Sequence, residues 1–142
     1  MKKIKTQPAP EYETLRRRSI SDLEAADILM KENRYDQAIE LCHFSLEKMM
    51  KAALIKYEGK PPRSGESGHN LLKIANTKTK SRKILLKAIK KNSIMLKCWE
   101  RIEGKWSTDL RYEFMGLESG DFDDLYESYR GLCRWIRTEL VE

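Results

Sequence analysis

The chain has 142 residues, and its 28 lysines and arginines outnumber its 22 aspartates and glutamates, which gives a formal net charge of +6. Hydrophobic residues make up 40% of the sequence and charged residues 35%, with only 7 glycines and 4 prolines. This composition excludes collagen-like, low-complexity and wholly disordered chains, and the length suits one domain. Because no apolar run approaches the roughly 20 residues that cross a bilayer, we expect a cytoplasmic protein with no membrane partner.

The cysteines indicate neither disulfides nor metal binding. Cys42, Cys98 and Cys133 are odd in number and lack C-x-x-C spacing, so we predict reduced, buried thiols. No cluster of histidines, cysteines and carboxylates has the spacing of metal ligands. We therefore expect no metal site and no cofactor.

The first helix is predicted just after the start of the chain. Residues 1–10 contain lysines and prolines without apolar periodicity, which predicts a flexible arm, and residues 11–142 are predicted to form one helical domain. From Glu11 onward, apolar residues fall on one broad face, and the pattern ends near Asn33.

The strongest amphipathic pattern follows, over residues 35–57, where apolar residues recur at steps of three and four. Gly59 and the prolines behind it end this predicted helix. Residues 63–68 have the composition of a loop, and residues 69–76 are long enough only for a short helix.

Two further long helices are predicted towards the end of the chain. One spans residues 81–103 and ends at Gly104, and the other begins with Asp121 as its N-cap. Residues 105–120 between them are interpreted as a connection with one turn of helix. Since no strictly alternating strand pattern occurs, the sequence predicts an all-α bundle of four long helices plus a short one.

Charge is unevenly distributed along the chain. Between Ser67 and Trp99 there are nine basic residues and no acidic ones, whereas Glu113 to Tyr129 carries six carboxylates and no lysine or arginine. A basic helix face is typical of phosphate binding, because lysines and arginines release counterions from nucleic acid. The alternatives are a solvated helix face and docking against the acidic segment of a second copy. The predicted basic patch consists of Lys80, Arg82, Lys83, Lys87, Lys90 and Lys91.

Several short motifs occur in an order that resembles the HEPN domain, the "higher eukaryotes and prokaryotes nucleotide-binding" family. The resemblance extends over residues 12–140. The motifs are Arg-Tyr-Asp-Gln-Ala at 34–38, Glu-Lys-Met-Met-Lys-Ala-Ala-Leu at 47–54, the Gly-Lys-Pro-Pro loop at 59–62, Gly-His-Asn-Leu-Leu at 68–72 and Trp-Ser-Thr-Asp-Leu-Arg-Tyr at 106–112.

This resemblance implies an antiparallel helical bundle that frequently forms homodimers. Some members are similar to metal-independent ribonucleases with an R-x(4–6)-H motif, and others bind nucleotide or RNA and pair with a minimal nucleotidyltransferase in toxin–antitoxin or defence modules. In this chain no histidine follows Arg111, where that motif is expected. Arg63 and His69 match the spacing, but within the predicted loop, and we interpret that match as accidental.

Two histidines are available for acid–base chemistry. His69 is the better one, because it follows Gly68 at a predicted helix start where backbone N–H groups favour anions. Its alternative role is to cap or pack at this junction. His43 lies one turn from both Glu40 and Glu47 and is interpreted as a surface or interface residue.

The remaining site residues are a lysine and an aromatic cluster. Lys51 is placed to pair with Glu47 one turn earlier, and the family resemblance implies that Lys51 faces a shared groove. Arg111, Tyr112 and Trp106 offer a guanidinium and aromatic rings for holding a phosphate and stacking a base. Alternatively, the two rings close the end of the bundle and Arg111 pairs with a neighbouring carboxylate.

Three functions are consistent with the sequence. The leading one is a HEPN-like domain without demonstrable catalysis that binds nucleotide or RNA phosphate and acts with a partner protein such as a minimal nucleotidyltransferase. The second is a metal-independent ribonuclease toxin that uses His69 with Arg63 or Arg111. The third is a protein–protein interaction module that works through its basic and acidic faces.

Overall fold

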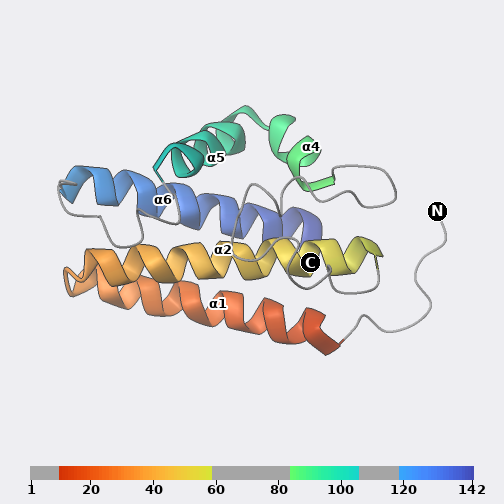
Figure 1. Cartoon of the computed structure of the whole chain (residues 1–142), viewed down its shortest axis with the longest axis horizontal. Coiled ribbons are helices and arrows are strands. Elements are labelled where there is room, and N and C mark those ends of the chain that lie inside the picture. The colour runs from red at the N-terminus through yellow and green to blue at the C-terminus, as the bar shows by residue number, and fades with distance from the viewer. Residues whose placement is uncertain (1–9, 59–83, 106–118) are drawn as a thin grey trace.

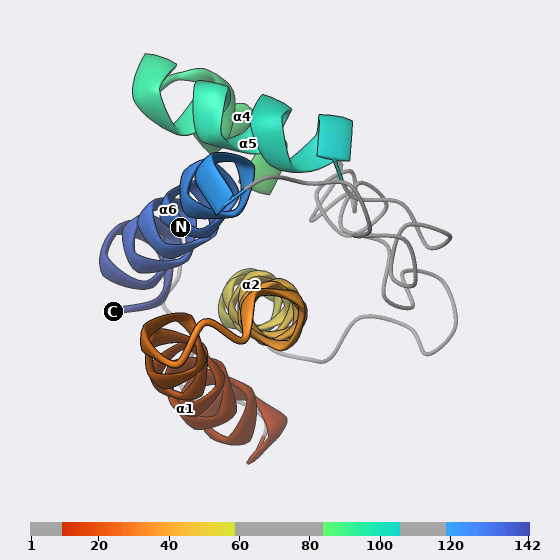
Figure 2. The same cartoon turned by 90° about the vertical axis from the view of Figure 1, so that its left-hand side faces the viewer.

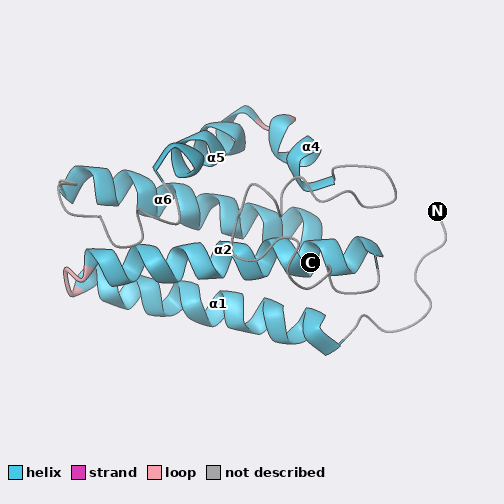
Figure 3. Ribbon diagram, viewed as in Figure 1, coloured by secondary structure: helices cyan, strands magenta, loops and turns pink. Residues whose placement is uncertain are grey.

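The computed structural model describes residues 10–58, 84–105 and 119–142, and within these ranges all regular structure is helical (Figure 3). This confirms the predicted all-α fold. The elements are α1 (Pro10–Lys31), α2 (Tyr35–Glu58), α4 (Ile84–Lys90), α5 (Ser93–Lys105), α6 (Ser119–Ile136) and a π-helical turn, η2 (Arg137–Val141).

Helices α1 and α2 form an antiparallel hairpin through a very short turn (Figure 1). Asn33 has a φ of 61°, a left-handed conformation that asparagine tolerates better than most residues. The amide of Arg34 donates to the carbonyl of Leu29 (2.8 Å), and the Tyr35 hydroxyl donates to Asn33 Oδ1 (2.8 Å). These bonds pair polar groups at the end of α1, and α2 begins at the next residue. The sequence had predicted the end of the first helix near Asn33, as observed.

The predicted helix over residues 81–103 is divided in the structure into α4 and α5. Asn92 separates them, and its side-chain oxygen accepts hydrogen bonds from the amides of Ile94 and Met95, each at 3.1 Å. Asparagine is among the strongest N-cap residues, because its oxygen replaces a missing intrahelical acceptor. Helix α5 therefore starts at Ser93 in a new direction (Figure 1).

Helix α6 begins at Ser119, so Asp121 lies within its first turn. The sequence had predicted Asp121 as the N-cap, so the helix starts earlier than expected. A carboxylate in the first turn still favours the helix, because it faces the positive end of the helix dipole. At the other end the amide of Glu142 donates to the carbonyl of Arg137 (2.7 Å), which closes the π-helical turn.

Helix α2 is the central element of the bundle. It packs against α1, α6, η2 and α4, and Figure 2 shows it between α1 on one side and α6 with α4 and α5 on the other. Helices α1 and α4 therefore lie on opposite sides of the molecule. The largest fully buried side chains are Ile39, Leu46, Met49, Met50, Leu54, Ile55, Leu85, Ile89, Ile102, Leu125 and Tyr129.

A buried polar cluster joins the three longest helices. The hydroxyl of Ser19 donates to the carbonyl of Ser45 (2.6 Å), and the hydroxyl of Ser45 donates to the carbonyl of Ser19 (2.7 Å). The thiol of Cys133 lies 3.2 Å from Ser45 Oγ. Small side chains let α1 and α2 approach closely, and each buried polar group finds a partner, as it must away from water.

Candidate functional site

Lysines form the outer face of α4 and of the turn residue that follows it. Lys87, Lys90 and Lys91 are exposed, whereas Leu85 and Ile89 on the opposite face are buried in the core. We call these three residues the α4 lysine face. No carboxylate among the described residues forms an ion pair with any of them. An unpaired ammonium group keeps its full capacity to contact an external anion.

The positive charge becomes diluted along α5. Lys97 and Arg101 are exposed, but so are Glu100 and Glu103 on the same helix. Arg101 also donates to the hydroxyl of Ser128 on α6 (2.7 Å), which ties it to the bundle. The strongest cationic surface of this region is therefore α4 itself.

Apart from Lys51, the other predicted site residues lie outside the described residues. Of the basic patch, these are Lys80, Arg82 and Lys83, and the same holds for the predicted short helix at residues 69–76. The structure thus brings together half of the predicted basic patch. The residues of the proposed ribonuclease and base-stacking sites that also fall outside it are Arg63, His69, Trp106, Arg111 and Tyr112.

Lys51 makes the predicted ion pair. Its ammonium lies 3.1 Å from Glu47 Oε2, one helical turn away, and the exposed fractions of the two side chains are 22% and 6%. Its neighbour Lys48 pairs with Asp22 of α1 and lies over the ring of Phe44, 5.9 Å from the ring centroid. Lys48 and Lys51 are thus both engaged within the fold.

His43 is fully buried within the single chain, so its interpretation as a surface or interface residue was wrong. Its Nδ1 lies 3.0 Å from the hydroxyl of Tyr129 on α6, and the two rings meet edge to face with centroids 6.0 Å apart. The reason is the central position of α2, which is covered by neighbours on more than its predicted apolar face. Complete burial removes His43 from surface chemistry.

The cysteines follow the prediction in part. Cys42 and Cys133 are buried free thiols, and Cys98 is half-buried. Burial raises the pKa of the Cys42 thiol and that of the Cys133 thiol above their ordinary values. Because the thiolate is the nucleophile, these two cysteines are unreactive at neutral pH.

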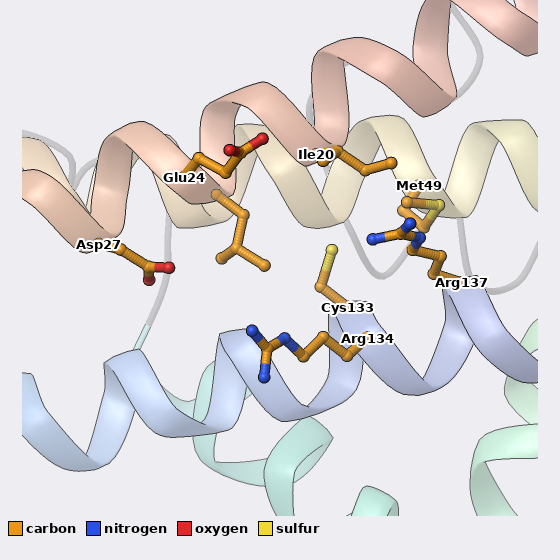
Figure 4. Close-up of a pocket in the computed structure, with 8 residues that line it drawn as sticks. Ile20, Glu24, Asp27, Met49, Cys133, Arg134 and Arg137 are labelled. Atoms are coloured by element: carbon orange, nitrogen blue, oxygen red, sulfur yellow. The ribbon is translucent and has the colours of Figure 1, made fainter.

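A pocket that the sequence did not reveal lies between α1 and α6, with α2 at its base (Figure 4). Its volume is about 170 Å³. We call it the α1–α6 pocket. Its apolar lining is Ile20, Leu23, Met49 and Cys133, and its charged lining is Glu24, Asp27, Arg134 and Arg137.

Two of the four charged groups in this lining are already paired. Asp27 accepts a hydrogen bond from the hydroxyl of Tyr126 and lies 3.3 Å from Arg130 Nε. Burial, followed by the Asp27 carboxylate, raises the pKa of Tyr126, so its hydroxyl stays protonated and donates. Arg137 Nε lies 2.7 Å from Glu142 Oε2.

The other two charged groups, Glu24 of α1 and Arg134 of α6, are exposed. Neither of them forms an ion pair with another described residue, and Figure 4 shows them on opposite walls of the pocket. The spacing of Arg130, Arg134 and Arg137 at four and three residues was a signal in the sequence for one cationic wall. Nothing in the sequence indicated that α1 supplies the facing wall.

Within the described part of the chain, no three histidine, cysteine or carboxylate side chains are placed to bind a metal ion. None of the described helices combines the length and apolar character that crossing a membrane requires.

Comparison with known proteins identifies the family. The sequence model of the HEPN domain matches residues 12–138, nearly the full chain. No curated protein and no solved structure matches this chain. The HEPN domain is helical, in agreement with the observed bundle, and its members are associated with nucleotide- and RNA-related functions. The motifs, the helical architecture and this match together show that the chain belongs to the HEPN domain family.

Proposed function

We propose that this HEPN domain binds the phosphate groups of RNA through the α4 lysine face. The observation that carries the proposal is the exposure of Lys87 and Lys90 on α4 and of Lys91 directly after it, with no ion-pair partner among the described residues. The basic residues before α4, which include Lys80, add charge of the same sign in the sequence.

Lysines without an ion pair among the described residues favour this role on physical grounds. RNA binding by lysine gains from the release of counterions that are condensed on the phosphates. Lys51 of α2 would first have to leave Glu47, which offsets that gain. The lysines of α4 have no such ion pair within the described residues to break, so their contact with phosphate keeps the full benefit.

The test compares two variants that each lose three positive charges. One is the triple variant Lys87→Ala, Lys90→Ala, Lys91→Ala. The control is Arg18→Ala, Lys31→Ala, Arg34→Ala, which removes three exposed cations of α1 and the turn behind it, on the opposite side of the bundle. Binding of a fluorescent single-stranded RNA is followed by anisotropy over a range of salt concentrations.

For the α4 variant we expect the slope of log K against log salt to fall by about 2, from about 0.7 per lost phosphate contact. The control is expected to retain the slope of the unmodified protein. Equal losses in both variants would mean that only net charge matters, and the proposal would then be wrong.

We also propose that the domain acts with a partner, as a homodimer that associates with a protein of the minimal nucleotidyltransferase type in a toxin–antitoxin or defence module. Family membership supports this proposal. Light scattering of the purified chain tests the dimer, and co-expression with a nucleotidyltransferase encoded beside it tests the pairing. A monomer that does not co-purify with such a protein would contradict both parts.

A further inference from the structure

The α1–α6 pocket has the size of a small ligand. Its volume of about 170 Å³ compares with the roughly 150 Å³ of an apolar cavity that accommodates benzene. Ile20, Leu23 and Met49 give it an apolar lining on α1 and α2. The Cys133 thiol, whose sulfur lies within hydrogen-bonding distance of Ser19 and Ser45, completes this lining. A single aromatic ring or a branched aliphatic group fits this space.

The charged residues at the pocket indicate which charged groups a ligand would carry besides its apolar part. Asp27 is neutralised by Arg130, and Arg137 is neutralised by Glu142. One carboxylate, Glu24, and one guanidinium, Arg134, remain without an ion pair among the described residues. Because these two charges cancel, the pocket favours a ligand that carries one positive and one negative group and has no net charge.

The position of the two charges agrees with such a ligand. Glu24 belongs to the α1 wall and Arg134 to the α6 wall, and they do not pair with each other across the opening (Figure 4). A zwitterion can donate from its ammonium group to Glu24 and accept from Arg134 with its carboxylate. Hydrogen bonds between ionised groups are the strong ones, and a guanidinium holds a carboxylate with two parallel bonds.

We propose that the α1–α6 pocket binds a free apolar α-amino acid, with phenylalanine as the best-fitting representative. The side chain lies against Ile20, Leu23 and Met49, the α-ammonium group binds Glu24, and the α-carboxylate binds Arg134. A phosphate monoester fits less well, because its double negative charge would find one guanidinium, Arg134, together with the carboxylate of Glu24. This site goes beyond the proposed RNA-binding function, and no residue of α4 lines it.

The first experiment locates the ligand. L-phenylalanine is titrated into the full chain carrying methyl-labelled isoleucine, leucine and methionine, and two-dimensional NMR spectra are recorded. A ligand of this size binds in the millimolar range. We expect saturable shifts of the Ile20, Leu23 and Met49 methyl signals below about 20 mM, as millimolar affinity requires. The absence of saturable shifts, or shifts confined to other methyl groups, would overturn the proposal.

Three further compounds test the charge requirement. 3-Phenylpropanoate lacks only the ammonium group of phenylalanine, phenethylamine lacks only the carboxylate, and adenosine monophosphate carries a phosphate. We expect each to bind at least about fivefold more weakly than phenylalanine, since each loses one ionic contact or adds a repulsive one. Binding of any of them as tight as that of phenylalanine would show that the pocket does not select a zwitterion.

Two substitutions link each charge to its protein partner. Glu24→Gln is expected to lower the affinity for phenylalanine about fivefold and to leave the affinity for 3-phenylpropanoate unchanged. Arg134→Gln is expected to lower the affinity for phenylalanine and to leave the affinity for phenethylamine unchanged. Glu32→Gln and Arg18→Gln, at exposed positions that do not line the pocket, serve as controls. Both pocket side chains are exposed, so the variants are expected to fold.

If Glu24→Gln weakens all ligands equally, or not at all, the assigned role of Glu24 is wrong. RNA binding is measured on the same variants and is expected to be unchanged. A failed amino-acid titration therefore leaves the RNA-binding proposal intact, and loss of RNA binding in the α4 variant leaves this site intact.

Discussion

The basic residues of α2 and those of α4 are in opposite situations. In α2, Lys48 pairs with Asp22, Lys51 pairs with Glu47, and Lys56 donates to the carbonyl of Val141 (2.7 Å). On α4 and directly after it, Lys87, Lys90 and Lys91 are exposed without an ion pair to any described carboxylate. Cations of the same type thus hold the bundle together in one helix and have no ion pair within the described part of the chain in the other.

This difference shows that the number of cations in a sequence segment does not reveal how many of them are paired within the fold. In the proposed function, the capacity to bind phosphate depends on whether a cation already has a partner in the fold. The comparison separates two measurable quantities. Changes in α2 and its contacts are expected to alter the free energy of unfolding, and changes on the α4 lysine face are expected to alter RNA affinity.

The largest expected effect comes from reversing the charge of the α4 lysine face. In the triple variant Lys87→Glu, Lys90→Glu, Lys91→Glu, we expect RNA affinity at about 50 mM salt to fall about 100-fold or more, because three phosphate contacts become repulsive. Thermal unfolding is expected to change little, since the three side chains are exposed. Unchanged affinity would show that α4 does not contact RNA.

Removing the Tyr129 hydroxyl from beside His43 is expected to give the largest loss of stability. In Tyr129→Phe the buried imidazole loses the hydroxyl that lies 3.0 Å from its Nδ1. We expect the free energy of unfolding to fall by about 1 to 3 kcal/mol, because a buried polar group loses a partner. Denaturant unfolding measures this loss, and RNA affinity is expected to stay the same.

The matched control is Tyr12→Phe. The Tyr12 hydroxyl donates to the carbonyl of Val141 (2.8 Å) in a half-buried position, so water can replace it and the loss is expected to be below about 1 kcal/mol. A larger loss for Tyr12→Phe than for Tyr129→Phe would contradict the structural role given to His43.

The ion pair of Lys48 provides a smaller effect and the most direct contrast with α4. Lys48→Met keeps most of the aliphatic stem and leaves Asp22 without its ammonium partner, so we expect a loss of about 1 kcal/mol in unfolding free energy. RNA affinity is expected to stay within twofold, because this lysine is engaged within the fold. A drop in RNA affinity equal to that of a single α4 substitution would break the contrast.

The smallest effect concerns pH. Hydrogen bonds from Arg137, followed by those from Arg16, lower the pKa of the Glu142 carboxyl below its ordinary value. A lowered pKa means that its stabilisation is complete above the unfolded-state value and is lost as pH falls through the lower, folded-state value.

Between about pH 7 and pH 3, the free energy of unfolding is therefore expected to fall by a few tenths of a kcal/mol less in Glu142→Gln than in the unmodified protein. The difference is small because surface ion pairs contribute little. Glu139→Gln removes an exposed carboxylate that makes no ion pair among the described residues and serves as the control. An identical pH dependence in the unmodified protein and Glu142→Gln would show that the Arg137–Glu142 pair does not stabilise the fold.

The sequence predicted those parts of the fold that depend on local periodicity and turn chemistry. The hairpin of α1 and α2 followed from apolar spacing on each side of Asn33, and the Glu47–Lys51 pair followed from its spacing of four residues. The division of α4 from α5 was missed, because apolar residues continue at helical steps across Asn92. The side chain of Asn92 was the available signal, since asparagine is a strong N-cap.

Features that depend on how helices pack were not accessible in the same way. His43 is buried because α2 has neighbours on several sides, and a single helix pattern does not reveal how many neighbours will cover it. The α1–α6 pocket combines Glu24 and Arg134, which are far apart in the sequence and meet only through tertiary packing. The lysines of α4 were identified from the sequence. Only the structure shows that no described carboxylate forms an ion pair with them.

The most direct test of the central claim is to map bound RNA onto the chain by NMR. A short single-stranded RNA is titrated into the isotope-labelled full chain, and shift changes are compared for α4 and α2. We predict that the signals of Lys87, Lys90 and Lys91 change most, and that those of Lys48 and Lys51 remain in place. Larger changes at the two α2 lysines, or changes spread evenly over all basic residues, would contradict the distinction between engaged and available cations.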